Sequence, residues 1–504
     1  MSKNSELHNP LPTGWVLTDL KNIGEWNGGG TPSKTNSEFW QNGRIPWFSP
    51  KDIKSLRLSK SIDNITENAI LGSAAKKIKK NSVLYVVRSG ILRNSLPVSI
   101  TAVPCAVNQD IKALTLYKEI LPDYVLYYSI SKDGDIRQNC AKNGTTVESI
   151  ETNALKSYPI SLPPLNEQKR IVAKIEELFT KLDAGKAALE KARLLLKQYR
   201  RSLLKHAFEG KLTARWREEN RGKIEPASVL LEKIREERKA KLGKKYREPE
   251  PVDASGLPEL PDGWVWARVG MLGELNRGKS KHRPRNAPFL YGGPYPFIQT
   301  GDIANSQGTI KSYRQTYSEK GLAQSRLWPE NTLCITIAAN IGDVAILGLE
   351  ACFPDSVVGF LPQGEHISVD YVYYYMKYIK DFLESNAPAT AQKNINLSIL
   401  NDITVPVAPL EEQLGIVSQL EYSFSIIQNI ESTLSQTENS GEALKSSILK
   451  SAFAGKLVPQ EPADEPAAEL LRRIKEEAAQ VEQLVLPLRR KARGKKKGVI
   501  KKKR

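Results

Sequence analysis

The side chains best suited to chemistry in this sequence are cations and amides that lie in loops. A loop at positions 277–285, which also contains Gly and Pro, carries five Lys or Arg residues and one His. Cations in such a loop can bind phosphate oxygens, and a guanidinium can also hydrogen-bond to a guanine edge. The alternative interpretation is a solvated basic loop without a ligand. The candidates are Arg277, Lys279, Lys281, Arg283 and Arg285, with His282 among them.

Polar side chains elsewhere in the chain extend this set of candidate nucleic-acid contacts. Those that follow the basic loop could read base edges: Gln299, Thr300, Asn340, Gln392, Lys393 and Asn394. Those in the first third of the chain combine cations with a short polar loop: Lys34, Arg44, Lys51, Arg57, Arg88, Arg93, Lys142, Asn143 and Thr145. The cationic run at 76–80 is more simply a solvated face.

Signatures of catalysis and of metal binding are missing from the sequence. It contains no GxxxxGK[ST] phosphate loop, and no Asn-Pro-Pro-aromatic or Asp-Pro-Pro-aromatic motif of amino-methyltransferases. A nuclease-like pair of carboxylates, Asp355 and Glu365, is followed by Ile367 where a Lys would be needed. The four His residues have no metal-ligand spacing, and the four Cys residues form no CxxC pair. We therefore predict no catalytic residue, no metal site and no cofactor bound by this chain itself.

Composition and charge indicate a chain that works in the cytoplasm next to a polyanion. Hydrophobic residues make up 40% of the 504 positions, enough for folded cores, and no run is long enough to suggest a transmembrane helix or a signal peptide. The formal net charge is +18, of which eleven charges lie in the acid-free tail at 489–504, so the other 488 residues carry +7. The tail is interpreted either as a cationic arm that contacts phosphates or as a solubilising end.

A duplicated segment supplies the framework that must position these candidates. Residues 164–212 open with Pro-Leu-x-Glu-Gln and close with Ala-Phe-x-Gly-Lys-Leu, and residues 409–457 repeat both motifs at an offset of 245. Between the motifs, apolar residues recur at alternating spacings of four and three, which predicts a long helix with a heptad seam. The residues predicted to pack in the seams are Ile171, Ile175, Leu178, Leu182, Leu189, Leu196, Leu203, Ile416, Leu420, Ile427, Ile430, Leu434, Leu444 and Ile448.

We expect the two long helices to pair within one chain as an antiparallel coiled coil, with the globular domains at its opposite ends. Each helix of about 43 residues should be roughly 64 Å long, close to two turns of B-DNA. The alternative is a coiled coil that joins two identical chains, which the duplication within one chain disfavours. The same spacing places Tyr199 and His206 at seam positions, so His206 is expected to be a packed or flanking side chain.

Two globular segments, 11–163 and 260–408, precede the long helices. Both open with Leu-Pro-x-Gly-Trp and contain short β-prone runs between clusters of Gly, Asn, Ser and Pro. Each also contains a helical stretch near its end, predicted over 369–384 in the second segment. Charged helical segments follow the long helices, at 213–259 with a linker and at 458–504 with the basic tail. The sequence thus predicts an α+β chain built from two copies of one unit: strand-rich domain, spacer helix and charged helix.

The duplicated motifs together resemble the specificity subunit of type I restriction-modification enzymes. The resemblance covers the chain from about residue 11 to 479. It implies two target-recognition domains, each reading one half of a split DNA sequence, and paired helices that act as a ruler between the half-sites. It also implies that two modification subunits and further restriction/translocase subunits bind this chain. S-adenosylmethionine, ATP and Mg²⁺ would belong to those partners, and the basic tail has no role in this scheme.

Two other classes of protein fit some of the same features. One is a stand-alone nucleic-acid-binding factor, which would bind its site tightly without enzyme partners. The other is a coiled-coil scaffold, whose complexes would not depend on DNA. The missing catalytic motifs make an enzyme the least favoured interpretation. Neither the DNA target nor the length of the gap follows from the residues, because base readout depends on how loop side chains are placed.

Overall fold

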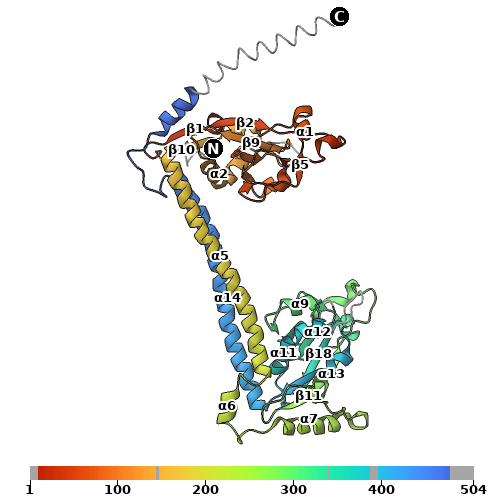
Figure 1. The fold of residues 1–504 in the computed structure, drawn as a ribbon. Coiled ribbons are helices and arrows are strands. Elements are labelled where there is room, and N and C mark those ends of the chain that lie inside the picture. Colours follow the sequence, from red (N-terminus) through yellow and green to blue (C-terminus); the bar gives the residue numbers. More distant parts are fainter. Residues whose placement is uncertain (1–9, 143–146, 339, 386–394, 477–504) are drawn as a thin grey trace. The chain divides into compact units, whose positions relative to one another are not determined.

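The computed structural model describes residues 10–142, 147–338, 340–385 and 395–476. The chain forms two compact units. The first unit comprises Met1–Ala188 and Gln436–Arg504, and the second comprises Leu189–Ser435. Each unit holds one globular domain and parts of both long helices (Figure 1). No described helix has the length and apolarity needed to cross a membrane.

The first globular domain is built on a five-stranded sheet that is antiparallel except at one edge. Its order is β2 (Gly24–Gly28), β9 (Ile111–Leu116), β6 (Val83–Val86), β7 (Val98–Thr101) and β4 (Arg57–Leu58), with β4 parallel to β7. A second sheet has the order β5 (Asp63–Ile65), β3 (Ile45–Phe48) and β8 (Ala106–Val107). The strands β1 (Val16–Asp19) and β10 (Pro159–Leu162) pair separately and bring the two ends of the domain together.

The second globular domain has the same topology. Its five-stranded sheet has the order β12 (Gly273–Arg277), β18 (Val357–Pro362), β16 (Leu333–Thr336), β17 (Val344–Leu347) and β14 (Thr309–Ile310). The strand β13 (Tyr291–Phe297) pairs with β15 (Gln315–Tyr317), and β11 (Val265–Arg268) pairs with β19 (Thr404–Val407). A single parallel bridge from Phe297 to Cys352 stands where the first domain has β8. The domain interiors, which match only at scattered points in sequence, therefore share one fold.

Short helices complete both domains. The first has α1 (Glu67–Gly72), α2 (Pro122–Ser131), α3 (Asp133–Asn139) and α4 (Thr152–Lys156). The second has α8 (Val269–Leu272), α9 (Thr300–Asn305), α10 (Glu319–Ala323), α11 (Val369–Tyr378), α12 (Lys380–Ser385) and α13 (Leu397–Asp402). The single helix predicted over 369–384 is therefore wrong, because the chain breaks at Ile379, which caps α11. Two helices, α6 (Ala214–Glu219) and α7 (Ala227–Leu242), follow the first long helix. The charged helix predicted in this stretch is therefore divided into two, with a break at 220–226.

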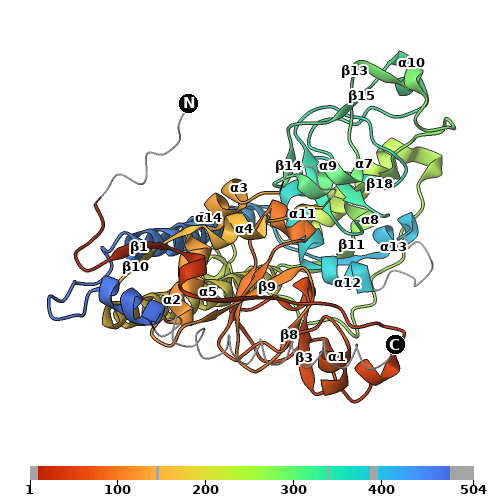
Figure 2. The same ribbon diagram turned by 90° about the horizontal axis from the view of Figure 1, so that it is seen from above.

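The predicted antiparallel pairing of the long helices is confirmed. Helix α5 spans Leu165–Phe208 and α14 spans Leu410–Phe453, and they lie side by side in both views (Figure 1 and Figure 2). In the first unit, Lys445 Nζ lies 2.8 Å from Asp183 Oδ1. In the second unit, Arg200 Nη2 lies 3.0 Å from Glu431 Oε2. Because the partner's number falls as the α5 number rises, the two helices run in opposite directions.

Of the fourteen residues predicted to pack in the seams, two are exposed. Ile430 and Leu444 are exposed, as are Tyr199 and His206. The half-buried positions are instead Arg200, Glu431 and Lys445, each one residue later than the strict heptad predicts. An unsupercoiled helix has 3.6 residues per turn and drifts about 20° per heptad against a 3.5-residue repeat. Because of this drift, the apolar residue at each of these positions points away from the partner helix. The charged residue that follows it lies at the edge of the seam instead. The other twelve are buried or half-buried.

The motifs shared by the two halves meet at one junction in each unit. In the second unit, the Cβ of a side chain at Gly210 would lie 2.3 Å from Pro261, and the backbone φ of Gly210 is +68°. Gly455 and Pro12 repeat this contact in the first unit, again at 2.3 Å and with φ of +69°. These two glycines are required, since any side chain would collide with the proline and would strain the left-handed backbone.

The charged helices also dock at these junctions, but each in the unit of the other sequence repeat. The amide of Ala227, the first residue of α7, donates to Gly263 O at 2.9 Å in the second unit. The amide of Ala467 donates to Gly14 O, also at 2.9 Å, in the first unit. Leu230 and Ile234 of α7 are buried there, as are Leu470, Leu471 and Ile474 in the first unit. The two sequence repeats therefore do not coincide with the two compact units. Each compact unit combines a globular domain from one repeat with a charged helix from the other.

Candidate nucleic-acid interface

The cationic side chains of the basic loop at 277–285 fall into two groups. Some project into solvent, and others form contacts that fix the conformation of the loop. Arg277, Lys279 and Lys281 are exposed and form no ion pair with any other described residue. Arg283 donates to two carbonyls of its own loop, Ser280 O at 2.7 Å and His282 O at 2.9 Å. Its peptide with Pro284 is cis. The three projecting cations are therefore the ones available to phosphate groups.

The base of this loop is fixed to the rest of the domain. Arg285 Nη2 lies 2.9 Å from both carboxylate oxygens of Asp355, so its charge is partly matched. The hydroxyl of Ser325 donates to Lys279 O at 2.8 Å, and Gln324 Oε1 accepts from the His282 amide at 2.9 Å. A loop held at several points presents its cations without the entropic loss that a mobile loop incurs on binding. The same contacts show that Asp355, the candidate nuclease carboxylate, is engaged with an arginine.

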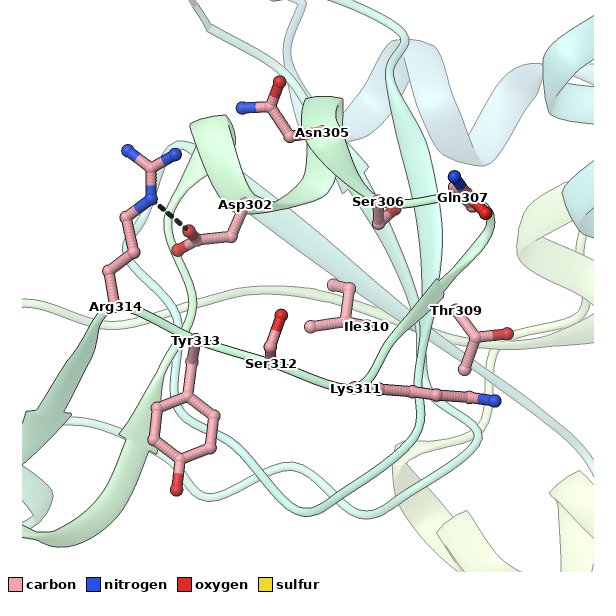
Figure 3. Close-up of a pocket in the computed structure, with 10 residues that line it drawn as sticks. All are labelled: Asp302, Asn305, Ser306, Gln307, Thr309, Ile310, Lys311, Ser312, Tyr313 and Arg314. Atoms are coloured by element: carbon pink, nitrogen blue, oxygen red, sulfur yellow. Dashed lines mark ion pairs between the residues drawn. The ribbon is translucent and has the colours of Figure 1, made fainter. Parts of the chain in front are cut away.

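A polar cleft that sequence reasoning did not identify lies between α9 and the loop that joins β14 to β15. Its volume is about 480 Å³. Figure 3 shows its walls, with Asp302 turned toward Arg314 across one end. The residues that line it are Asp302, Asn305, Ser306, Gln307, Thr309, Ile310, Lys311, Ser312, Tyr313 and Arg314. Amides, hydroxyls, two cations and one exposed aromatic ring are the groups that proteins use to contact bases and phosphates.

The Asp302 carboxylate holds the wall of this cleft in place. It accepts a hydrogen bond from the Gln299 amide at 3.0 Å and lies 3.7 Å from Arg314 Nε. The predicted Gln299 donates through its side chain to Gln315 Oε1 at 2.6 Å, and Thr300 begins α9. Neither predicted residue lines the cleft, but Thr300 belongs to the helix that supplies Asp302 and Asn305, and Gln299 immediately precedes that helix. The run Lys-Ser-Tyr-Arg at 311–314 is the signal in the sequence that could have led to it, since it places two cations beside an aromatic residue in a short loop.

The first domain has a loop of the same construction between β4 and β5. There the Asp52 carboxylate accepts from the Ser49 amide and from the Ile62 amide, both at 2.8 Å. Asp52 and Asp302 occupy corresponding places, 250 positions apart in the sequence. The loop of the first domain presents Lys60 and the largely exposed Ile62, whereas the loop of the second presents Lys311 and Tyr313. One scaffold thus displays two different sets of side chains.

The remaining predicted contacts vary in how available their charges are. Lys34, Arg44, Lys51 and Arg88 are exposed and form no ion pair with another described residue. Arg57 is paired with Asp123 at 2.5 Å, and Arg93 with Glu148 at 3.2 Å, so their charges are partly neutralised. Lys142 and Asn340 are exposed. Asn143, Thr145, Gln392, Lys393 and Asn394 lie outside the described residues.

The described residues contain no group of three His, Cys, Asp or Glu side chains placed to hold a metal ion. The four cysteines are all buried, as predicted, and burial raises the pKa of Cys105 and of Cys140 to about 11. Thiols of that kind are poor nucleophiles at neutral pH.

Comparison with known proteins places this arrangement in context. Residues 12–194 and 261–438 match the family model of the type I restriction modification DNA specificity domain. The EcoR124I/EcoR124II specificity subunit of Escherichia coli is 45% identical over 161 residues, which cover 32% of this chain and 40% of that protein. The EcoDI specificity subunit, also of E. coli, is 27% identical over 67% of this chain and 72% of its own length. The StySPI specificity subunit of Salmonella potsdam is 22% identical over 93% of this chain and 96% of its own length.

Solved structures share the fold. A chain from a study of complex assembly and conformational transition of the type I R-M system aligns with a TM-score of 0.61 at 20% identity, covering 89% of this chain and 100% of that one. The HsdS subunit from Thermoanaerobacter tengcongensis aligns with a TM-score of 0.57 at 19% identity, covering 89% and 99%. At this level of identity the likeness concerns the fold.

Proposed function

Because this chain belongs to the type I restriction-modification DNA specificity family, whose model matches both of its halves, we propose that it binds a bipartite DNA target with one globular domain per half-site. The chain is a non-catalytic specificity subunit of such a system. The first half-site is read by the domain at 11–163 and the second by the domain at 260–408. Methylation, translocation and cleavage belong to partner subunits.

One observation carries this proposal. The two domains share a topology and a carboxylate-anchored loop, but the side chains on that loop differ. A duplicated scaffold that kept its frame and changed its exposed loop is suited to contact two different sequences with the same geometry. Phosphate contacts by the cations of the 277–285 loop would fix the register of the second domain, and the cleft residues would read base edges. Lys34, Arg44 and Lys51 would serve the same purpose in the first domain.

The paired helices are proposed to set the distance between the half-sites. Helices α5 and α14 have 44 residues each, about 66 Å at roughly 1.5 Å per residue. They pair in both units, and the buried ends of both helices belong to the hydrophobic cores of the domains. A domain fused in this way to a stiff helix cannot slide along it, so the helix length would be transmitted to the gap.

Two modification subunits are proposed to bind the duplicated framework, and restriction/translocase subunits to join them. A repeated arrangement of domain and helix ends offers each modification subunit an equivalent position. S-adenosylmethionine would be bound by the modification subunits, and ATP with Mg²⁺ by the restriction/translocase subunits. The duplex DNA itself is the third partner.

An exchange of one domain tests the independence of the two readers. Residues 14 to 162 are replaced by the corresponding domain of a relative, and the methylated sequence is mapped in cells that also make the modification subunit. The expected result is a new first half-site with the second half-site and the gap unchanged. The matched control exchanges the second domain and should change only the second half-site. If one exchange alters both half-sites, the domains do not read independently.

A further inference from the structure

The loop that joins β4 to β5 and its counterpart that joins β14 to β15 can be aligned residue by residue. Each has four residues, 59–62 in the first domain and 311–314 in the second. The strands before the loops pair in parallel with corresponding strands, β7 and β17, and the strands after them pair with β3 and β13. The helix that follows, α1 or α10, is capped by a hydroxyl side chain that accepts from a backbone amide at 3.3 Å. This alignment, at an offset of 252, places Ile62 at the same position as Arg314.

The anchoring carboxylate of each domain faces this loop position, but it contacts a different group in each. In the first domain, Asp52 Oδ1 accepts a hydrogen bond from the backbone amide of Ile62 at 2.8 Å. In the second, Asp302 Oδ1 lies 3.7 Å from Arg314 Nε (Figure 3). The other oxygen of each carboxylate accepts from the backbone amide three residues earlier, so both carboxylates are fixed. One domain therefore uses the carboxylate to hold the loop backbone, and the other directs it toward a side chain.

The Arg314 side chain keeps its hydrogen-bond donors available. It is 80% exposed, whereas the side chain of Asp302 is only 8% exposed. The carboxylate lies on the Nε side, and the two terminal amino groups of Arg314 have no hydrogen-bond partner among the described residues. Two parallel N–H donors of a guanidinium match the O6 and N7 acceptors of guanine in the major groove. A fixed carboxylate next to Nε also restricts this flexible side chain before it binds, which reduces the entropy lost on binding.

Ile62 offers a different chemistry at the same loop position. It is 68% exposed, although its backbone is held by Asp52. The hydroxyl of the preceding Ser61 accepts from the Trp47 amide at 3.2 Å and donates to Asp63 O at 2.7 Å. The loop thus presents an aliphatic side chain from a fixed backbone. Such a side chain has no donor or acceptor, and the feature of a base edge that it can contact favourably is the C5-methyl group of thymine.

We infer that Ile62 and Arg314 are specificity-determining residues, with Arg314 selecting a guanine in the second half-site and Ile62 selecting a thymine in the first. Asp302 is a positioning residue that holds the Arg314 guanidinium. The inference rests on the proposed function and deepens it, because it assigns the chemical identity of one base in each half-site. It also explains how one scaffold selects two different bases: the carboxylate stays in place, and the loop residue that it faces changes from an aliphatic side chain to a guanidinium.

Base analogues in the mapped target test the guanine assignment. The full chain is assembled with its modification subunit, and binding to duplexes is measured by fluorescence anisotropy. Each guanine of the second half-site, on either strand, is replaced in turn by 7-deazaguanine, which lacks the N7 acceptor. One replacement should weaken binding by the unaltered chain about fivefold or more, and the same replacement should have no effect on Arg314→Ala. The control Lys311→Ala should weaken binding to both duplexes equally.

The role of Asp302 is tested with the same duplexes. Asp302→Asn keeps an acceptor for the backbone amide but removes the charge that faces Arg314. It should reduce the response to that one 7-deazaguanine and leave the rest of the second half-site selected as before. A merely structural role would weaken binding to all duplexes and leave the response to the analogue unchanged.

Deoxyuridine tests the thymine assignment, because it lacks only the C5-methyl group. At one position of the first half-site, replacing thymine with deoxyuridine should weaken binding by the unaltered chain roughly fourfold, the effect of one buried methyl group. Ile62→Ala should bind the two duplexes equally, and the control Lys60→Ala should keep the difference. Ile62 and Arg314 are both exposed, so their replacement leaves the cores of the domains intact.

The outcomes separate this inference from the proposed function. If no guanine of the second half-site responds to the analogue, or if Arg314→Ala keeps the full response, the guanine assignment is wrong while the function stands. The thymine assignment is wrong if deoxyuridine has no effect at any position of the first half-site, or if Ile62→Ala still distinguishes the two duplexes. If the assembled complex binds no bipartite site at all, the proposed function itself is wrong.

Discussion

Replacing the glutamate of the Pro-Leu-x-Glu-Gln motif with Gln should destabilise the second unit and should not destabilise the first. In the second unit, Glu412 is fully buried and accepts hydrogen bonds from Thr213 Oγ1 at 2.6 Å, Arg217 Nη2 at 2.6 Å and Trp264 Nε1 at 2.9 Å. The Arg217 side chain is only 17% exposed. Replacing Glu412 with Gln would leave this guanidinium without a counter-charge and would turn amide hydrogens toward donors.

The loss can be estimated from the burial of the pair. Removing one partner of a buried ion pair costs about 3–5 kcal/mol, because the other charge stays buried. For a unit of this size each kcal/mol lowers the melting temperature by roughly 2–4 °C. Glu412→Gln should therefore lower the melting temperature of the second unit by about 6–20 °C. The fold explains the size of the effect, since these four residues join the domain, the start of α14 and the segment after α5.

The first unit supplies the matched control. Glu167 is buried at the corresponding position, but one of its carboxylate oxygens and the indole nitrogen of Trp15 have no hydrogen-bond partner among the described residues. Burial raises the pKa of Glu167 above its ordinary value of 4.5, although the nearby Trp15 indole and the Arg170 guanidinium act in the opposite direction. The folded carboxyl thus holds a proton that the unfolded chain releases, so ionised Glu167 reduces stability as the pH rises above that value. Glu167→Gln should be neutral or stabilising at pH 7 and should remove this pH dependence.

Calorimetry gives the melting temperatures, and hydrogen exchange followed peptide by peptide assigns the change to a unit. Glu412→Gln should speed exchange in the second unit and leave the first unaltered. Equal destabilisation by Glu412→Gln and Glu167→Gln would refute the reasoning, because it would mean that the Arg217 contacts contribute nothing specific.

Three further predictions concern DNA binding by the complex. Replacing Lys279 with Ala should make the slope of log K against log salt about 0.9 less negative, the contribution of one phosphate contact, whereas Lys76→Ala should leave the slope unchanged; fluorescence anisotropy at several salt concentrations measures both. Tyr313→Ala should relax the second half-site and leave the first unaltered in a selection from random DNA, and an equal effect on both would show that the cleft does not read bases. Seven residues inserted into each helix, near Asp183 and near its partner Lys445, keep the heptad register and add about 10.5 Å. The gap in the methylated sequence should then lengthen by roughly three base pairs at about 3.4 Å each, and an unchanged gap would contradict the ruler.

Much of the framework could be predicted from the sequence, because it is built from local signals that occur twice. The alternating spacing of Ile171, Ile175 and Leu178 determines a helix whatever surrounds it, and the duplication supplies its partner. The shift of the seam at Tyr199 and Ile430 could not be predicted, because it depends on how far the helices depart from an ideal 3.5-residue repeat. The docking of the second charged helix also depends on a contact between distant parts of the sequence, that of Ala467 with Gly14.

The candidate site was predictable in its chemistry and less so in its members. Cations between Arg277 and Arg285 are visible in the sequence, but only the structure shows that Arg283 and Arg285 are engaged within the domain. The cleft next to α9 could not be predicted, because it forms where a short helix and a loop meet and neither segment contains a recognised motif. Nothing in the sequence distinguishes Tyr313 and Lys311 from other polar or aromatic residues. They become candidate DNA contacts because they line the same cleft as Asp302.

The measurement that most directly tests the central claim is a map of the methylated bases in cells that make this chain with its modification subunit. The account predicts a bipartite motif, with two specific half-sites separated by a gap of fixed length and unspecified sequence. It also predicts that the motif disappears when this chain is omitted. A continuous motif, or the same motif in cells that lack the chain, would contradict the claim that its two domains each read one half-site.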